Sequence, residues 1–276
     1  MYLEYWGLHE LPFENTPDPR FLYLSPTHQE ALVRLLYAIK GRKGASMLVG
    51  EIGAGKTVLS RSLIARLPAD QYDIGLVTNP SLPPVDLLRE ILYQLGVTTP
   101  SGDHLHQPEN QASSKLALLH ALNEHCLRNW RQGKDTVIIV DEAQCIDDLD
   151  TFEELRLLLN FQLNERFLLT LLLIGQPELK ERIAMLPQLE QRIALRYHLT
   201  PLDAEGTANY IQHRLSVAQA SRPIFTPDAL RAVYDYTSGV PRRINTLCDF
   251  SLLMGANTQE TMIEAKLITQ LAQEGI

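Results

Sequence analysis

Cysteine is scarce in this chain of 276 residues, and its spacing excludes whole classes of protein. There are three cysteines, none of them in a C-x-x-C pair: Cys126, Cys145 and Cys248. An odd number of widely separated cysteines builds neither a disulfide framework nor a zinc site, and is typical of reduced thiols. We therefore expect a cytosolic protein whose thiols pack in the core.

Long apolar runs and excess basic charge are also missing. No run approaches the roughly 20 apolar residues of a membrane-spanning helix. The first residues contain an early Glu4 and no basic stretch, unlike a signal peptide. The formal net charge of -8 argues against strong non-specific binding of nucleic acid. We expect a cytoplasmic protein with no transmembrane segment of its own.

The most informative segment that is present is rich in glycine. Residues 50–57 match G-x-x-x-x-G-K-[ST] in full, the loop that wraps the phosphates of ATP or GTP. Lys56 would reach the β- and γ-phosphates, and Thr57 would place its hydroxyl on Mg²⁺. A strand predicted before this loop and a helix predicted at 58–67 complete its usual setting. The predicted nucleotide-binding residues are Gly50, Glu51, Ile52, Gly53, Ala54, Gly55, Lys56, Thr57 and Val58.

Apolar strands alternate with helices as far as residue 201, and only helical spacing follows. Such strands indicate a parallel sheet covered on both faces, so the expected fold class is α/β with a following all-helical domain. The polar stretch 97–114 predicts a loop. Strands are predicted at 45–49, 74–77, 136–140, 167–174 and 195–199, and helices at 58–67, 86–95, 115–131, 149–162, 204–218, 227–237 and 242–257. The expected organisation is an ordered, extended aromatic and proline segment at 1–25, an α/β core at 26–201 and a helical lid at 202–276.

Two acids follow one of the apolar strands that the sequence predicts. Asp141 and Glu142 come directly after 136–140, which is a Walker B arrangement. Asp141 would hold Mg²⁺ through water, and Glu142 would polarise the attacking water as general base. Alone, a strand followed by two acids is a weak signal, because solvated acids also occur at strand ends. Combined with the phosphate-binding loop, it predicts hydrolysis of the nucleotide.

Polar residues at two other strand ends are candidates for the same reaction. Asn79 would hold Glu142 away from water until a partner engages, or it is a turn residue before Pro80. Gln176 would orient the water or touch the γ-phosphate, or it belongs to a simple strand-to-helix turn.

Two arginines complete the candidate set. Arg192, before the last strand, would enter a neighbouring subunit's site as an arginine finger, or it forms a surface salt bridge. Arg242, in Gly-Val-Pro-Arg at a helix start, would reach the γ-phosphate and report nucleotide state, or it is simply exposed.

This order of motifs resembles the AAA+ ATPases, and further strings narrow the resemblance to the ExeA/GspA type of general secretion pathway ATPase. The strings are Tyr5-Trp6-Gly7-Leu8, Leu11-Pro12-Phe13, 16–25, His28-Gln29-Glu30-Ala31-Leu32, Asp141-Glu142-Ala143-Gln144, 174–179, Arg196-Tyr197-His198-Leu199 and 238–242. The resemblance covers nearly the whole chain. It implies an AAA+ P-loop fold, an ATPase with Mg²⁺, and an oligomer, ring or filament, that shares ATP sites. It also implies Tyr23 and Leu24 as contacts to the base, although both also suit core packing.

The resemblance further implies a role in assembling envelope complexes of type II secretion or of an MSHA-type pilus, with peripheral attachment at the inner membrane left open. Longer members continue into a membrane span and a cell-wall-binding domain, so the chain is expected to be an MshM-like stand-alone form or a fragment. Two alternatives stay open: a TniB/TnsC-like regulator directed to DNA, and a slow nucleotide-switched scaffold. GTP also stays open, although no guanine-specific N-K-x-D motif occurs.

Overall fold

The computed structural model describes residues 2–16, 18–97, 114–164 and 166–275. The predicted loop at 97–114 therefore lies almost entirely outside the described residues. By contacts the chain divides into two compact units that interleave in sequence. Unit 1 comprises Met1–Gln29, Glu51–Arg61 and Leu199–Ile276, and unit 2 comprises Glu30–Gly50 and Ser62–His198.

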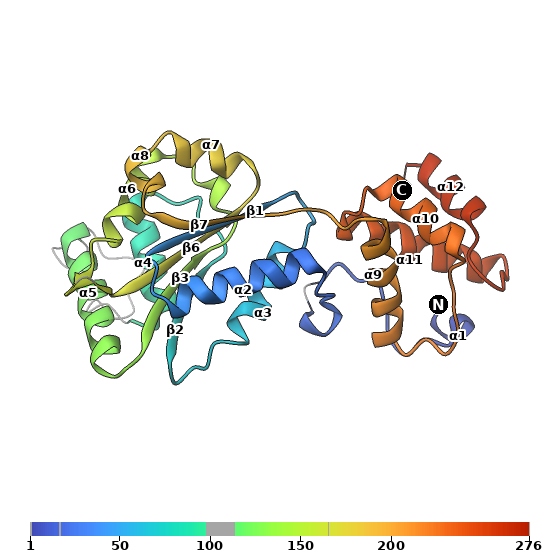
Figure 1. The fold of residues 1–276 in the computed structure, drawn as a ribbon, viewed down its shortest axis with the longest axis horizontal. Helices are drawn as coiled ribbons and strands as arrows, with labels where there is room; N and C mark the ends of the chain where they lie inside the picture. The colour runs from blue at the N-terminus through green and yellow to red at the C-terminus, as the bar shows by residue number, and fades with distance from the viewer. Residues whose placement is uncertain (1, 17, 98–113, 165, 276) are drawn as a thin grey trace, which may run out of the picture. The chain divides into compact units, whose positions relative to one another are not determined.

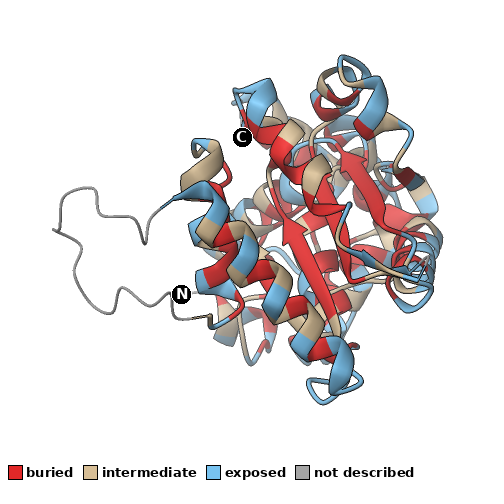
Figure 2. Ribbon diagram, turned by 90° about the vertical axis from the view of Figure 1, so that its left-hand side faces the viewer, coloured by how far each residue is buried: buried red, intermediate tan, exposed pale blue. Residues whose placement is uncertain are grey.

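Unit 2 is organised around a five-stranded sheet with the strand order β2-β3-β6-β1-β7. The pairs β2/β3, β3/β6 and β1/β6 are parallel, with Val77 opposite Val140 and Val49 opposite Gly175. Every residue of β1 and β6 is buried, as a sheet covered on both faces requires (Figure 2). The strands are β1 Ala45–Gly50, β2 Tyr72–Val77, β3 Asp135–Val140, β6 Leu169–Gly175 and β7 Ile193–Leu199.

Amphipathic helices cover this sheet and close one apolar core. Leu88 and Ile91 of α4, Leu122 of α5 and Leu155 of α6 join the strand residues in that core. Helix α5 begins at the N-cap Ser114, whose hydroxyl accepts the Ala117 N–H at 3.2 Å. The helices are α2 Pro26–Lys40, α4 Pro84–Gln94, α5 Lys115–Arg131, α6 Leu149–Leu158, α7 Glu178–Ala184 and α8 Pro187–Glu190, with the short helix η3 Ala143–Cys145 and the hairpin β4 Gln162–Leu163, β5 Arg166–Phe167 (Figure 1).

Unit 1 has a second core, built from helices. Two helix starts are capped as their sequences predict, since Asp203 accepts the Gly206 N–H at 2.7 Å and Thr226 accepts the Ala229 N–H at 3.2 Å. The helices are α9 Ala204–Val217, α10 Pro227–Thr237, α11 Pro241–Asn257 and α12 Ala265–Gln273; α3, Lys56–Ile64, begins within this unit. Of these, α12 is not predicted above.

The N-terminal residues belong to the core of unit 1, and they correct one expectation. The predicted extended segment contains a short helix, α1 Leu3–Trp6, and a 3₁₀ turn, η1 Pro19–Phe21. Trp6 is 1% exposed, and its indole N–H donates to the Leu252 carbonyl at 2.8 Å. Apolar contact with α11 therefore folds residues whose own sequence favours no regular structure.

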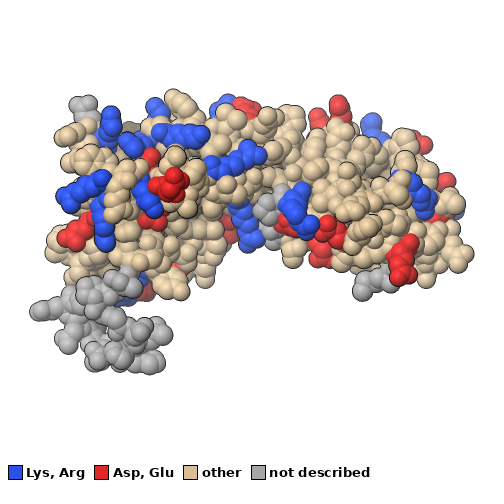
Figure 3. All heavy atoms as spheres, turned by 90° about the horizontal axis from the view of Figure 1, so that it is seen from below, with Lys and Arg blue, Asp and Glu red and all other residues tan. Residues whose placement is uncertain are grey.

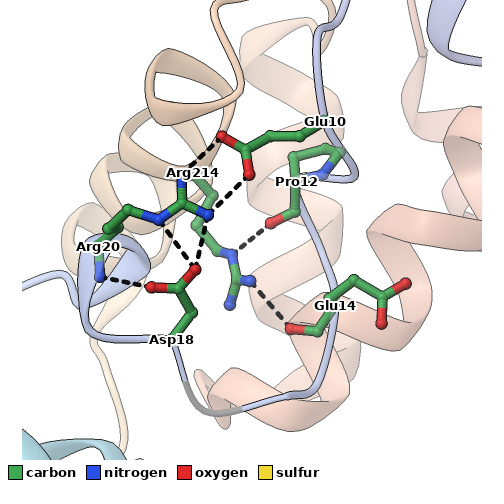
Figure 4. Close-up of polar contacts among 6 residues, drawn as sticks. All are labelled: Glu10, Pro12, Glu14, Asp18, Arg20 and Arg214. Atoms are coloured by element: carbon green, nitrogen blue, oxygen red, sulfur yellow. Dashed lines mark hydrogen bonds and ion pairs between the residues drawn. The ribbon is translucent and has the colours of Figure 1, made fainter.

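A buried arginine ties this segment to α9. Arg214 donates to the carbonyls of Pro12 and Glu14, the latter at 2.9 Å (Figure 4). Nearby, Arg20 bonds to Asp18 and to Glu10 at the surface (Figure 4). Since the guanidinium satisfies carbonyls that have no helix or strand partner, it lets an irregular segment pack against a helix.

Candidate functional site

The phosphate-binding loop runs from the end of β1 to the start of α3. Gly53 and Gly55 have φ values of 80° and 96°, a region that side chains with a Cβ rarely adopt. A Cβ at Gly53 would also lie 2.6 Å from Cβ of Arg242. Both the backbone conformation and the available space therefore require glycine at this position. The Lys56 ammonium donates to the Glu51 carbonyl at 3.1 Å, across the loop that it would complete around a phosphate.

A buried histidine supports this loop from α2. His28 is 4% exposed, with Nε2 3.1 Å from the Ala54 carbonyl and Nδ1 2.7 Å from the Ser25 hydroxyl. Because a carbonyl only accepts, Nε2 carries the proton, and the hydroxyl donates to Nδ1. Burial lowers the pKa of His28, which favours this neutral form. In the sequence, His28 appeared only within a string of the family resemblance, and no role was predicted for it.

Three other predicted residues lie in the same unit as the loop. The Arg242 backbone N–H, at the start of α11, donates to the Gly53 carbonyl at 3.3 Å, and the residue is exposed. Tyr23 and Leu24 are half-buried. The Tyr23 ring lies 6.3 Å from the Tyr210 ring and 5.8 Å from the His213 ring, centroid to centroid. Unit 1 thus holds residues 51–58 together with Tyr23, Leu24 and Arg242.

The Walker B acids lie at the carboxyl end of β3, in unit 2. Asp141 is 4% exposed, its N–H donates to the Val77 carbonyl at 2.9 Å, and its carboxylate accepts the Glu142 N–H at 2.9 Å. Glu142 has a φ of 53°, a left-handed conformation that is uncommon without a glycine. The turn directs the chain into η3 immediately after the strand, and this fixes where the Glu142 side chain begins.

A glutamine that the sequence interpretation left without a role holds this side chain. Gln144 donates from Nε2 to Oε2 of Glu142 at 2.6 Å, and its Oε1 accepts the Gln176 N–H at 2.9 Å. A Cβ at Gly175 would lie 2.7 Å from Oε1 of Gln144, so the glycine at the end of β6 makes room for the amide. The structure thereby brings Glu142 and Gln176 together through Gln144.

Unit 2 also contains Asn79 and Arg192. Asn79 is exposed just beyond β2, and the amide bonded to Glu142 comes from Gln144. Arg192 is half-buried, and its guanidinium donates to Oδ1 of Asn160 at 3.3 Å. Its neighbour Arg196 instead pairs with the Glu190 carboxylate at 3.0 Å. Gly50, Asp141 and Gln176 complete the candidates of this unit.

The two predicted magnesium ligands belong to different units, Thr57 to unit 1 and Asp141 to unit 2. Each would offer an oxygen atom, the kind of ligand that Mg²⁺ prefers. Among the described residues, no three or more His, Cys, Asp or Glu side chains gather as a metal cluster would require.

None of the described helices is both long enough and apolar enough to cross a bilayer.

A family model for the AAA domain matches residues 39–183, which include the phosphate-binding loop, the Walker B acids and Gln176. This chain belongs to the AAA domain family. The narrower resemblance is confirmed as well. The chain is 40% identical to general secretion pathway protein A of Aeromonas hydrophila over 92% of its own length and 44% of that protein. It therefore spans less than half of that relative.

Distant solved structures agree on the fold. The ORC2 protein of Aeropyrum pernix, in a structure with ADPNP and ADP, superposes with a TM-score of 0.67 at 18% identity, over 95% of this chain and 71% of that one. A RuvB mutant of Thermotoga maritima superposes with a TM-score of 0.57 at 17% identity, over 89% of this chain and 68% of that one. The expected AAA+ fold class is confirmed.

Proposed function

We propose that this AAA protein binds ATP with Mg²⁺, hydrolyses it to ADP and phosphate, and supports assembly of a type II secretion or MSHA-type pilus complex. The observation that carries the enzymatic part is the carboxylate at the end of β3. Glu142 is placed by a left-handed turn and held by an amide, as a general base must be held to act on one water.

The motifs assign a role to each residue of the reaction. Residues 50–58 bind the phosphates through backbone N–H groups, and Lys56 bonds to the β- and γ-phosphates. Glu142 accepts a proton from the water that attacks the γ-phosphate, and Gln176 orients that water. Thr57 and Asp141 hold Mg²⁺, which when bound offsets charge on the phosphates.

We assign the remaining candidates to regulation of this site. Arg192 acts in the site of a neighbouring copy, within a ring or filament that shares its ATP sites. Arg242 links the state of the loop to a helical lid at 202–276, which follows a core at 26–201. The bond from its backbone N–H to the Gly53 carbonyl supports this link. Tyr23 and Leu24 contact the base.

The cellular part of the proposal rests on the relative from Aeromonas hydrophila, whose name places that protein in general secretion. We also propose a peripheral position at the inner face of the envelope, as the family resemblance implies. A regulator directed to DNA is less well supported. The net charge is -8, and basic and acidic side chains are interspersed on the face that Figure 3 draws.

Nucleotide binding and hydrolysis, measured separately on purified protein, test the enzymatic part. Lys56→Ala should lose binding of a fluorescent ATP analogue. Glu142→Gln should bind it normally while turnover falls at least about 100-fold. Near-normal turnover by Glu142→Gln would show that Glu142 is not the general base. Comparison with GTP decides the nucleotide, and salt-sensitive DNA binding stimulated by ATP would favour the DNA-directed alternative.

A further inference from the structure

The side-chain amide of Gln144 lies between two elements that are distant in sequence. On one side it donates to the Glu142 carboxylate at 2.6 Å, and on the other it accepts the Gln176 N–H at 2.9 Å. Its Nε2 also lies 3.5 Å from Sγ of Cys145. All of these partners belong to unit 2, at the carboxyl ends of β3 and β6.

The partners fix the orientation of this amide. A carboxylate only accepts a hydrogen bond and a backbone N–H only donates one, so the nitrogen of Gln144 must face Glu142 and its oxygen must face Gln176. If the amide were flipped, its nitrogen would face the Gln176 N–H, so two donors would meet, and its oxygen would face the Glu142 carboxylate, so two acceptors would meet. The missing Cβ of Gly175 leaves space for Oε1, and any side chain there would push the amide out of position.

We propose that Gln144 is a positioning residue for the ATPase reaction: its amide holds the Glu142 carboxylate in the orientation of a general base and fixes that carboxylate to the end of β6. The proposal deepens the proposed function and rests on it. Gln144 acts through Glu142, so the energy of the hydrogen bond appears in turnover and not in the affinity for nucleotide.

Two substitutions separate the amide's charge pattern from its volume. Gln144→Glu keeps the length and the acceptor for Gln176 but replaces the donor with a charge that repels Glu142. Gln144→Ala removes both contacts. Each should lower kcat at least about tenfold, a part of the 10²–10⁴ that a general base supplies, while KM for ATP changes less than about twofold. Gln71→Glu, the same change at an exposed position before β2, is the matched control and should leave kcat unchanged.

A double-mutant cycle tests whether the effect passes through Glu142. In the Glu142→Gln background, Gln144→Ala should lower kcat by less than about twofold, because the group that it positions is already absent. An equal loss in both backgrounds would overturn the proposal. So would a rise in kcat of Gln144→Ala, which would make the amide a brake, or a loss that lies in KM alone.

Nuclear magnetic resonance gives a readout that does not depend on hydrolysis. With ¹⁵N-glutamine labelling, the Gln144 side-chain amide and the Gln176 backbone N–H are both observed. Glu142→Gln should shift the first, and Gln144→Ala should shift the second, while Gln71→Glu shifts neither. If the wild-type protein hydrolyses no ATP but these shifts occur, the proposed function fails while the contact stands. If hydrolysis is normal and the resonances do not respond, the positioning role is refuted alone.

Discussion

Loss of the His28 contact should weaken nucleotide binding, and two substitutions isolate the nitrogen responsible. A glutamine amide reaches about as far as Nε2 of histidine, whereas an asparagine amide reaches about as far as Nδ1. His28→Gln therefore keeps a donor for the Ala54 carbonyl and loses the bond to Ser25. His28→Asn keeps a partner for Ser25 and loses the bond to Ala54, which lies inside the phosphate-binding loop.

The magnitude follows from burial. Ala54 is 1% exposed, so without His28 its carbonyl has to be desolvated without a partner, at a cost of about 1–3 kcal/mol. If nucleotide binds only the ordered loop, about 1–2 kcal/mol of this appears in binding. Kd for ATP should then rise roughly 5- to 30-fold in His28→Asn and less than about threefold in His28→Gln.

Titration with a fluorescent ATP analogue measures the two affinities. Circular dichroism establishes that both variants keep the helical content of the wild type. The reasoning is refuted if His28→Asn binds as the wild type does, or if the two variants lose equal affinity. In either case the loop would not depend on the bond to Nε2.

Three further predictions concern oligomerisation, packing and pH. If turnover per chain rises with protein concentration in the wild type, Arg192→Ala should still bind ATP but lose that rise. Arg196→Ala, the control, should keep the rise. A wild-type protein that stays monomeric with constant turnover would show that Arg192 does not act in trans. Arg214→Met removes the guanidinium that donates to the Pro12 and Glu14 carbonyls, and Glu14 keeps only the bond from Asn245 at 3.4 Å. The substitution should destabilise unit 1 by about 2–4 kcal/mol, whereas Arg231→Met, at the surface, should cost less than about 0.5 kcal/mol. Trp6 fluorescence in a Trp130→Phe background reports the unfolding of unit 1 in denaturant titrations, and equal effects of the two substitutions would contradict the role of Arg214. The pKa of His28 in the folded state lies below its ordinary 6.5, so below that pH the unfolded chain binds a proton more readily than the folded state does. The free energy of unfolding of the wild type, relative to that of His28→Gln, should therefore be constant above pH 6.5 and fall as the pH decreases below it. A difference between the two free energies that does not change with pH would refute the buried neutral histidine.

The strands and the longer helices could be predicted because their signals are local. Residues 115–131 and 227–237 were predicted with the bounds that the structure gives, since each has apolar residues at helical spacing and a start signal, Ser114 or Thr226-Pro227. The strand predicted at 136–140 begins one residue earlier, at Asp135. The last strand was predicted from 195 but starts at Ile193, because the chain leaves α8 within two residues.

Interactions between distant residues explain what the sequence interpretation missed. Gln144 and Gln176 are 32 residues apart, and His28 and Ala54 are 26 apart, so neither contact leaves a periodic pattern. The short helix at Leu3–Trp6 exists because Trp6 is buried against α11, far along the chain. The Walker residues were predictable because their chemistry requires fixed spacing within one short segment.

The core of unit 1 has a consequence for the order of folding during synthesis. Unit 2 is nearly continuous in sequence, so it can fold once residue 198 has left the ribosome. Trp6 and Phe13, however, share one apolar core with Ile244, Leu252 and Leu271, which are made much later. At the usual 5–20 residues per second, these aromatic side chains wait roughly 10 to 50 seconds for their partners. The nascent chain therefore exposes this apolar segment throughout that interval, during which a molecular chaperone can bind it.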